Sequence, residues 1–142
     1  MRTLLSYPVN LWVEDDGTTI VFPDIPEAIT GHADKAAALN LASDCLEEAL
    51  AGRMLDREDI PVPSPARGRP LVAPGAVMAG KTALYKEMRA RGLSNAALAR
   101  MLGVRETEVR RMLDPKHATK IGRLEQALAT LGQRIVVSVE PA

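Results

Sequence analysis

The stretch Ser94–Leu113 limits the possible folds most tightly, because it holds two short amphipathic segments with one glycine between them. In the first segment apolar side chains recur at helical spacing, and Ser94 can cap its start. Gly103 can end that helix, and a second stripe that includes Val109 and Met112 predicts another helix directly after a tight turn. The pattern predicts a helix-turn-helix, although an ordinary pair of packed helices with a solvated basic face has the same spacing.

In a helix-turn-helix the second helix enters the major groove of DNA, and its exposed side chains meet the bases. The start of the preceding helix can donate hydrogen bonds to a phosphate. The residues that we expect to contact DNA are therefore Arg105, Thr107, Arg110 and Arg111 on the second helix, with Ser94 and Asn95 at the start of the first.

The charge of the chain is unevenly divided, although the formal net charge is zero. Residues 1–80 hold six Lys and Arg against twelve Asp and Glu, and residues 81–142 hold twelve against six. A basic module with a helix-turn-helix is the expected footprint of a DNA-binding protein. An acidic module repels phosphate and suits a basic protein partner.

The first part of the chain has the composition of a small α+β domain, since β-branched and aromatic residues recur in short runs bounded by turn residues. The expected strands are Leu4–Val13, interrupted by Pro8, then Thr18–Phe22, Ala28–Thr30 and Leu71–Val72. Asp34 can cap a helix that extends to about Gly52. Its expected apolar stripe is Leu39, Ala42, Leu46, Ala49 and Leu50. The predicted order is βββαβ.

Composition changes between Ile60 and Gly80, where five prolines and three glycines predict an extended linker. We therefore expect one domain over residues 1–75 and a second, all-α domain over residues 76–142. Helices are expected from Lys81 to Gly92 and from a cap at Thr119 to Gly132, on either side of the helix-turn-helix.

A strand is predicted at the end of the helical domain, because apolar and polar side chains alternate over Arg134–Glu140. It has no neighbouring strand in sequence to pair with, and an unpaired edge needs a cover. The simplest cover is the same strand of a second chain, with Ile135, Val137 and Val139 in the dimer interface.

Several site classes are disfavoured by the residue content. One cysteine, Cys45, excludes an internal disulfide, and two histidines, His32 and His117, give no zinc ligand set. No apolar run approaches the roughly 20 residues of a membrane span, and the start lacks the pattern of a signal peptide. We expect a cytoplasmic protein without a metal or cofactor.

Two regions carry a resemblance to a known family. The run Phe22–Gly31, followed by an alanine-rich helix, resembles the N-terminal domain of HicB antitoxins, which neutralise the toxins of HicA/HicB pairs. Lys81–Tyr85, the helix-turn-helix, and His117–Lys120 with the helix after it resemble the C-terminal DNA-binding module of that family. The resemblance covers nearly the whole chain and keeps the domain order.

The resemblance implies a partial RNase H-like domain that docks on a HicA-type, mRNA-cleaving RNase toxin, and a second domain that represses its own operon. Trp12, Asp24, Ile25 and Glu27 are the candidate toxin contacts, against the competing interpretation that Trp12 is core and Asp24 caps a turn. The operator is expected to be an inverted repeat, bound by a dimer or by a tetramer of this chain.

Two other functions are compatible with parts of the sequence. An RNase H-like fold can host a two-metal nuclease, but the acids of this chain lie in a turn and on a helix surface, where nothing brings them together. We therefore expect no enzyme. A free-standing transcription regulator with a ligand-sensing N-terminal domain is the alternative, weakened by the presence of only one Phe and one Trp to line a pocket.

Overall fold

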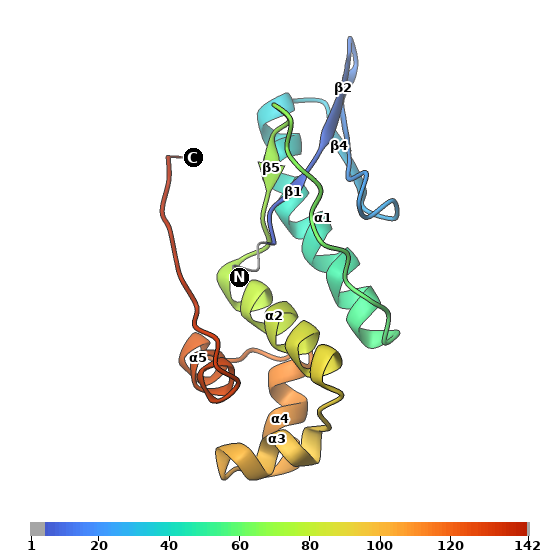
Figure 1. Ribbon diagram of the computed structural model, residues 1–142. Coiled ribbons are helices and arrows are strands. Elements are labelled where there is room, and N and C mark those ends of the chain that lie inside the picture. The colour runs from blue at the N-terminus through green and yellow to red at the C-terminus, as the bar shows by residue number, and fades with distance from the viewer. Residues whose placement is uncertain (1–4, 142) are drawn as a thin grey trace. The chain divides into compact units, whose positions relative to one another are not determined.

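The computed structural model describes residues 5–141, and the chain divides into two compact units, Met1–Gly75 and Ala76–Ala142 (Figure 1). The first is a small α+β unit and the second is helical. The coarse fold class predicted from the sequence is therefore confirmed.

The strands of the N-terminal unit belong to two adjoining ladders. A two-residue strand β1 (Tyr7–Pro8) pairs antiparallel with β5 (Leu71–Val72). The antiparallel order β2-β3-β4 follows, with β2 at Asn10–Glu14, β3 at Gly17–Val21 and β4 at Ile29–His32. Pro8 has no N–H to donate, but the Val9 N–H still donates to the carbonyl of Pro70, just before β5, at 3.0 Å. The chain therefore changes partner after Val9, and Asn10 pairs with Val21 of β3.

Helix α1 (Lys35–Leu55) packs on β3 and β4 and completes the core of this unit. A side-chain oxygen of Asp34 accepts a hydrogen bond from the Ala37 N–H at 2.9 Å, which is the cap expected from the sequence. The helix runs three residues past Gly52, and Met54 is buried in this last turn. Burial of that side chain outweighs the cost of a helical glycine, about 1 kcal/mol.

The proline-rich segment is not the linker that its composition predicts. The Tyr7 hydroxyl donates to the carbonyl of Pro61 at 2.7 Å. One carboxylate oxygen of Asp24 accepts from both the N–H and the hydroxyl of Ser64, at 2.9 and 3.0 Å. Burial of the Tyr7 phenol, with Asp24 nearby, raises its pKa to about 12. Hydrogen bonds to the Pro61 carbonyl and from the N–H and hydroxyl of Ser64 therefore hold the segment on the N-terminal unit.

The C-terminal unit consists of α2 (Ala76–Arg91), α3 (Asn95–Leu102), α4 (Glu106–Leu113) and α5 (Ile121–Thr130). Its core is formed by Leu84, Met88, Leu98, Ala99, Val109, Met112, Leu124, Ala127, Leu128 and Leu131. Helix α2 begins five residues before the predicted start, and Gly80 lies inside it. A Cβ at Gly80 would meet Leu124 at 3.0 Å, so glycine allows α2 and α5 to pack closely.

Two further expectations for this unit are corrected. Lys120, not Thr119, is the N-cap of α5, and its side chain has no acceptor with which to cap the helix. The Thr119 hydroxyl instead accepts from the Lys81 ammonium at 2.6 Å. Residues 134–140 carry no strand, since the described chain offers them no ladder partner. Pairing with a second chain stays a prediction.

Replacing Asp24 by Ala should lower the free energy of unfolding by about 1 to 3 kcal/mol, because the Ser64 N–H and hydroxyl lose their acceptor. Trypsin should then cut faster at Arg67 and Arg69, which lie within and at the end of a turn of the same segment. Asp16→Ala, in the exposed hairpin turn, is the matched control and should change stability by less than about 0.5 kcal/mol. Equal urea unfolding and equal trypsin digestion of the two variants would show that the Asp24–Ser64 hydrogen bonds do not hold this segment.

Candidate functional sites

The connection between α3 and α4 has the local geometry of a tight helix-turn-helix. The Ser94 hydroxyl oxygen accepts from the Ala97 N–H at 3.1 Å and caps α3. Gly103 ends α3 in the left-handed region, at φ 68°, which a glycine adopts without strain. The Val104 N–H then donates to the carbonyl of Ala99 at 3.0 Å. These bonds cap both ends of α3, and α4 begins after the short connection of residues 103–105. Figure 1 shows α3 crossing α4.

Helix α4 presents a basic face to solvent. Val109 and Met112 are buried, whereas the predicted contact residues Arg105, Thr107, Arg110 and Arg111 are all exposed. Arg110 lies 3.7 Å from Glu106 on the same helix, with both side chains more than half exposed. Exposed pairs of this kind contribute little, about 0 to 1 kcal/mol, so Arg110 can exchange Glu106 for an anion at small cost.

The predicted DNA contacts lie at the start of α3, at the start of α4 and on the exposed face of α4. Ser94 is exposed and Asn95 half-buried at the start of α3, and the Ser94 hydroxyl proton is not needed for the cap. The acidic Glu108 on α4 lies 3.8 Å from Arg123 of α5. The arrangement can bind a polyanion through arginines and helix N–H groups.

The N-terminal sheet has one buried and one exposed face. Thr18 and Ile20 of β3 are buried on the face toward α1, so Thr19 and Val21 alternate to the other face. Trp12 is the ladder partner of Thr19, and Ile29 is the partner of Val21. Trp12 is 59% exposed and Ile29 60% exposed. We call these four residues, Trp12, Thr19, Val21 and Ile29, the outer sheet face.

The position of Trp12 decides between two sequence interpretations, because a tryptophan that is more than half exposed is not part of the core. Sequence reasoning missed Ile29 as its companion. The alternation along β3 and β4 was the signal that could have found it, since residues two apart in a strand share a face.

The other three candidate toxin contacts lie in different environments. Ile25 is fully buried, because tight turns between Phe22 and Ala28 place its side chain in the core. The prediction that this side chain is a surface contact is therefore wrong. Asp24 accepts hydrogen bonds from Ser64, forty residues later in the chain, so its carboxylate makes a long-range contact and not the local turn cap of the competing interpretation. Glu27 is exposed and forms a bidentate ion pair with Arg53, at 2.5 and 2.8 Å. The hydrogen bond from Arg53 lowers the pKa of the Glu27 carboxyl.

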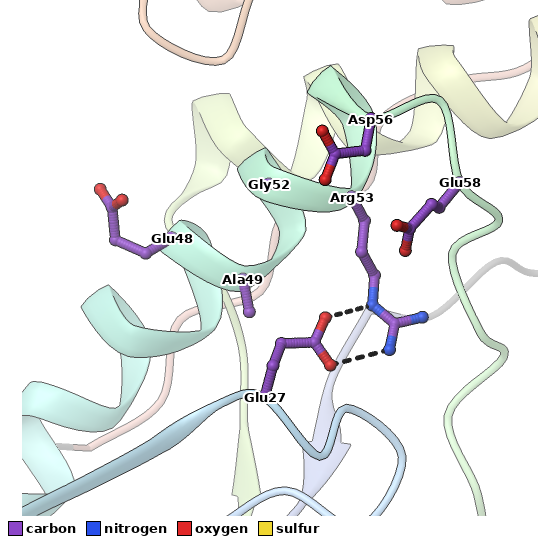
Figure 2. A pocket seen from close by; sticks show the side chains of 7 residues that line it. All are labelled: Glu27, Glu48, Ala49, Gly52, Arg53, Asp56 and Glu58. Carbon is purple, nitrogen blue, oxygen red and sulfur yellow. Dashed lines mark hydrogen bonds and ion pairs between the residues drawn. The ribbon is translucent and has the colours of Figure 1, made fainter.

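An acidic hollow of about 430 Å³ lies at the end of α1 and is lined by Glu27, Glu48, Ala49, Gly52, Arg53, Asp56 and Glu58 (Figure 2). Four of these side chains are carboxylates, and the single guanidinium among them is already bound to Glu27. The carbonyl end of α1 adds partial negative charge. The hollow therefore favours cationic groups over anions.

The predicted dimer residues separate into two kinds. Ile135 is half-buried against the core of the helical unit, whereas Val137 is 68% and Val139 94% exposed. Ile135 therefore anchors the terminal segment to its own chain, and the two valines lie on a surface that a partner can cover.

The remaining chemistry-bearing groups form no cluster within the described part of the chain. Burial raises the pKa of the Cys45 thiol. Within residues 5–141, no three His, Cys, Asp or Glu side chains are placed to hold a metal ion together. None of the described helices combines the length and apolar character that crossing a membrane requires.

Known proteins resemble this chain over both units. Residues 6–74 match a family described as the HicB_like antitoxin of bacterial toxin-antitoxin system. Antitoxin HicB 2 of Photorhabdus laumondii is 39% identical over 135 residues, which cover 95% of this chain and 96% of that protein. Antitoxin HicB 1 of the same organism is 34% identical, covering 96% of this chain and 88% of its own length. Antitoxin HicB of Escherichia coli K12 is 32% identical, with coverage of 92% and 96%.

Proposed function

Because the chain belongs to the HicB antitoxin family, we propose that residues 1–75 bind and silence a HicA-type, mRNA-cleaving RNase toxin, while residues 76–142 bind the operator of its own operon. The observation that carries the proposal is the charge of the two compact units. Residues 1–75 hold six basic and twelve acidic side chains, and residues 76–142 hold twelve and six. One chain thus carries an acidic surface for a basic protein and a basic surface for DNA.

The acidic unit is suited to a partner that itself binds RNA, since such a partner must present basic side chains. Electrostatic complementarity speeds the encounter, and a few buried apolar anchors lengthen the life of the complex. The outer sheet face supplies such anchors in Trp12 and Ile29. At the end of the hairpin that carries Trp12, the turn residues Asp15 and Asp16 are exposed acids. We propose this face and its acidic rim as the toxin contact, and Glu27, which lines the hollow at the end of α1, as a further contact.

The strand and helix order supports a partial RNase H-like fold for this unit, because β1 and β2 are one run split at Val9 and the order is then βββαβ. We propose that the N-terminal unit binds the toxin and catalyses no reaction. The exposed carboxylates around the hollow act there as a charge complement for cationic side chains.

The basic unit is proposed to read DNA with α4 in the major groove. Two copies would place two α4 helices about one turn, roughly 34 Å, apart on an inverted-repeat operator. The exposed Val137 and Val139 support pairing of residues 134–140 between two chains, in a dimer or in a tetramer built from dimers. Sedimentation of the intact chain as a monomer would contradict this assembly.

Replacing Trp12 by Ala should weaken toxin binding by about 2 kcal/mol or more, because a tryptophan buried at an interface is a frequent energetic centre. Since Trp12 is exposed in the free chain, the free energy of unfolding should change by less than about 0.5 kcal/mol. Calorimetric titration with the purified toxin measures the first quantity, and urea unfolding the second. Val62→Ala, which shortens a side chain 79% exposed on the proline-rich segment, is the control and should bind as the unaltered chain does. Equal affinities for the two variants would exclude Trp12 from the interface.

Replacing Arg110 by Ala should cost about 1 to 3 kcal/mol of operator binding and relax the preference at one base position, if the guanidinium meets a base edge. Affinities for the operator and for single-base variants of it, measured at one fixed salt concentration, give this result directly. An equal loss on operator and random DNA would instead show that Arg110 contacts a phosphate.

A further inference from the structure

Lys81 is a buried cation and is not one of the side chains that we propose to contact DNA. Its side chain, on α2, is only 1% exposed. The ammonium nitrogen donates to the carbonyls of Arg111 and Met112, at 2.9 and 3.1 Å, and to the hydroxyl of Thr119 at 2.6 Å. All three donor protons of an ammonium group thus have acceptors.

Two of the three acceptors are carbonyls in the last turn of α4, and the third is a hydroxyl of the chain that follows that helix. The carbonyls in the last turn of a helix are not all satisfied by backbone donors, although the Asp114 N–H lies 3.3 Å from the carbonyl of Arg111, and the helix dipole makes this end partially negative. A buried ammonium is costly without such partners. Burial lowers the pKa of Lys81, and the nearby Asp114 partly opposes that shift. The hydrogen bonds between the ammonium and these carbonyls therefore replace those that each group would otherwise make to water.

The same contact joins three segments of the helical unit. Lys81 belongs to α2, its two carbonyl acceptors belong to α4, and Thr119 belongs to the connection that leads into α5. The Thr119 hydroxyl also lies 3.3 Å from the Arg111 carbonyl, to which it can donate. An ammonium with three fixed acceptors allows α4 little freedom to rotate or slide relative to α2.

A second cation on α2 provides a comparison within the same unit. Arg91 donates to the carbonyl of Leu131, at the C-cap of α5, and pairs with Glu87 at 2.7 Å. Its side chain is 43% exposed, and its helix end is that of α5 and not of α4. Arg91 is therefore a matched control for a cation that caps a neighbouring helix without touching α4.

We propose that Lys81 is a positioning residue for operator recognition, which fixes the rotation and depth of α4 so that its exposed side chains meet the correct base edges. The proposal rests on the proposed function of α4 in DNA binding. Non-specific binding depends on phosphate contacts, which tolerate small movements, whereas base contacts require a fixed helix. Loss of the ammonium should therefore reduce the preference for operator over random DNA more than it reduces binding to DNA in general.

The test compares Lys81→Met with Arg91→Met in the full chain, at a temperature well below the melting of either. Both variants remove one positive charge from α2. Affinities for operator and random DNA at one salt concentration give the preference, and amide exchange of Glu106–Leu113 reports the local stability of α4. Lys81→Met should lose about tenfold in preference, the size of one lost base contact, and its α4 amides should exchange faster. Arg91→Met should keep the preference, even if it melts earlier.

A purely structural role would lower the melting temperature of both variants and leave the preference of both unchanged, which would overturn the proposal. If Lys81→Met does not fold, Thr119→Val removes one acceptor without changing charge, and Thr119→Ser restores it. An equal preference in those two variants would also overturn it. If the unaltered chain shows no preference for the operator, the proposed function fails. Positioning by Lys81 is then refuted separately if α4 exchange is the same in Lys81→Met and the unaltered chain.

Discussion

The burial of α1 against one side of the N-terminal sheet determines which side chains this unit can offer to another molecule. Ile20, Phe22 and Leu46 are buried in that contact, so the alternating residues of β3 must lie on the opposite face. Trp12 and Ile29 are exposed there as a consequence, in a unit with twice as many acidic as basic side chains. The same packing that stabilises the fold therefore leaves an apolar face with acids nearby, which is the combination expected for contact with a basic protein.

Helix ends organise the second unit in a comparable way. The apolar core brings four helices together, but apolar contacts alone do not fix how one helix is rotated against another. Lys81 and Arg91 of α2 each donate to carbonyls at the end of another helix, α4 and α5 respectively. Directional bonds of this kind specify geometry as well as stability. In the proposed function α4 reads bases with its exposed side chains, which makes this geometry a functional quantity.

Local patterns predicted the parts of the structure that local chemistry determines. Helix α3 begins after Ser94 and ends at Gly103 as expected, because a cap and a left-handed glycine act within one turn of the chain. The same holds for Asp34 at the start of α1. Non-local contacts determined what the sequence could not show. Gly80 was taken for the end of a linker, yet it lies inside α2, where its missing side chain admits Leu124 from a helix some forty residues later. The residues around Ser64 have the composition of a linker, but Asp24 and Tyr7 hold that segment on the sheet unit.

The candidate sites show the same division between local and non-local information. The exposed arginines of α4 follow from helical periodicity, whereas the buried Ile25 lies in a short turn where no periodicity indicates which way a side chain points. Lysine is a residue type that sequence arguments place in solvent, and Lys81 is nevertheless buried. Its burial depends on Arg111, Met112 and Thr119, which lie thirty or more residues away, so only the structure reveals it.

The central claim is that the acidic unit silences the toxin and the basic unit binds DNA. RNA cleavage by the purified toxin, measured with increasing amounts of residues 1–75 or of residues 76–142, tests that division most directly. The account predicts that residues 1–75 stop cleavage at an equimolar ratio, and that residues 76–142 leave cleavage unchanged while binding promoter DNA. Inhibition by residues 76–142, with none by residues 1–75, would contradict it.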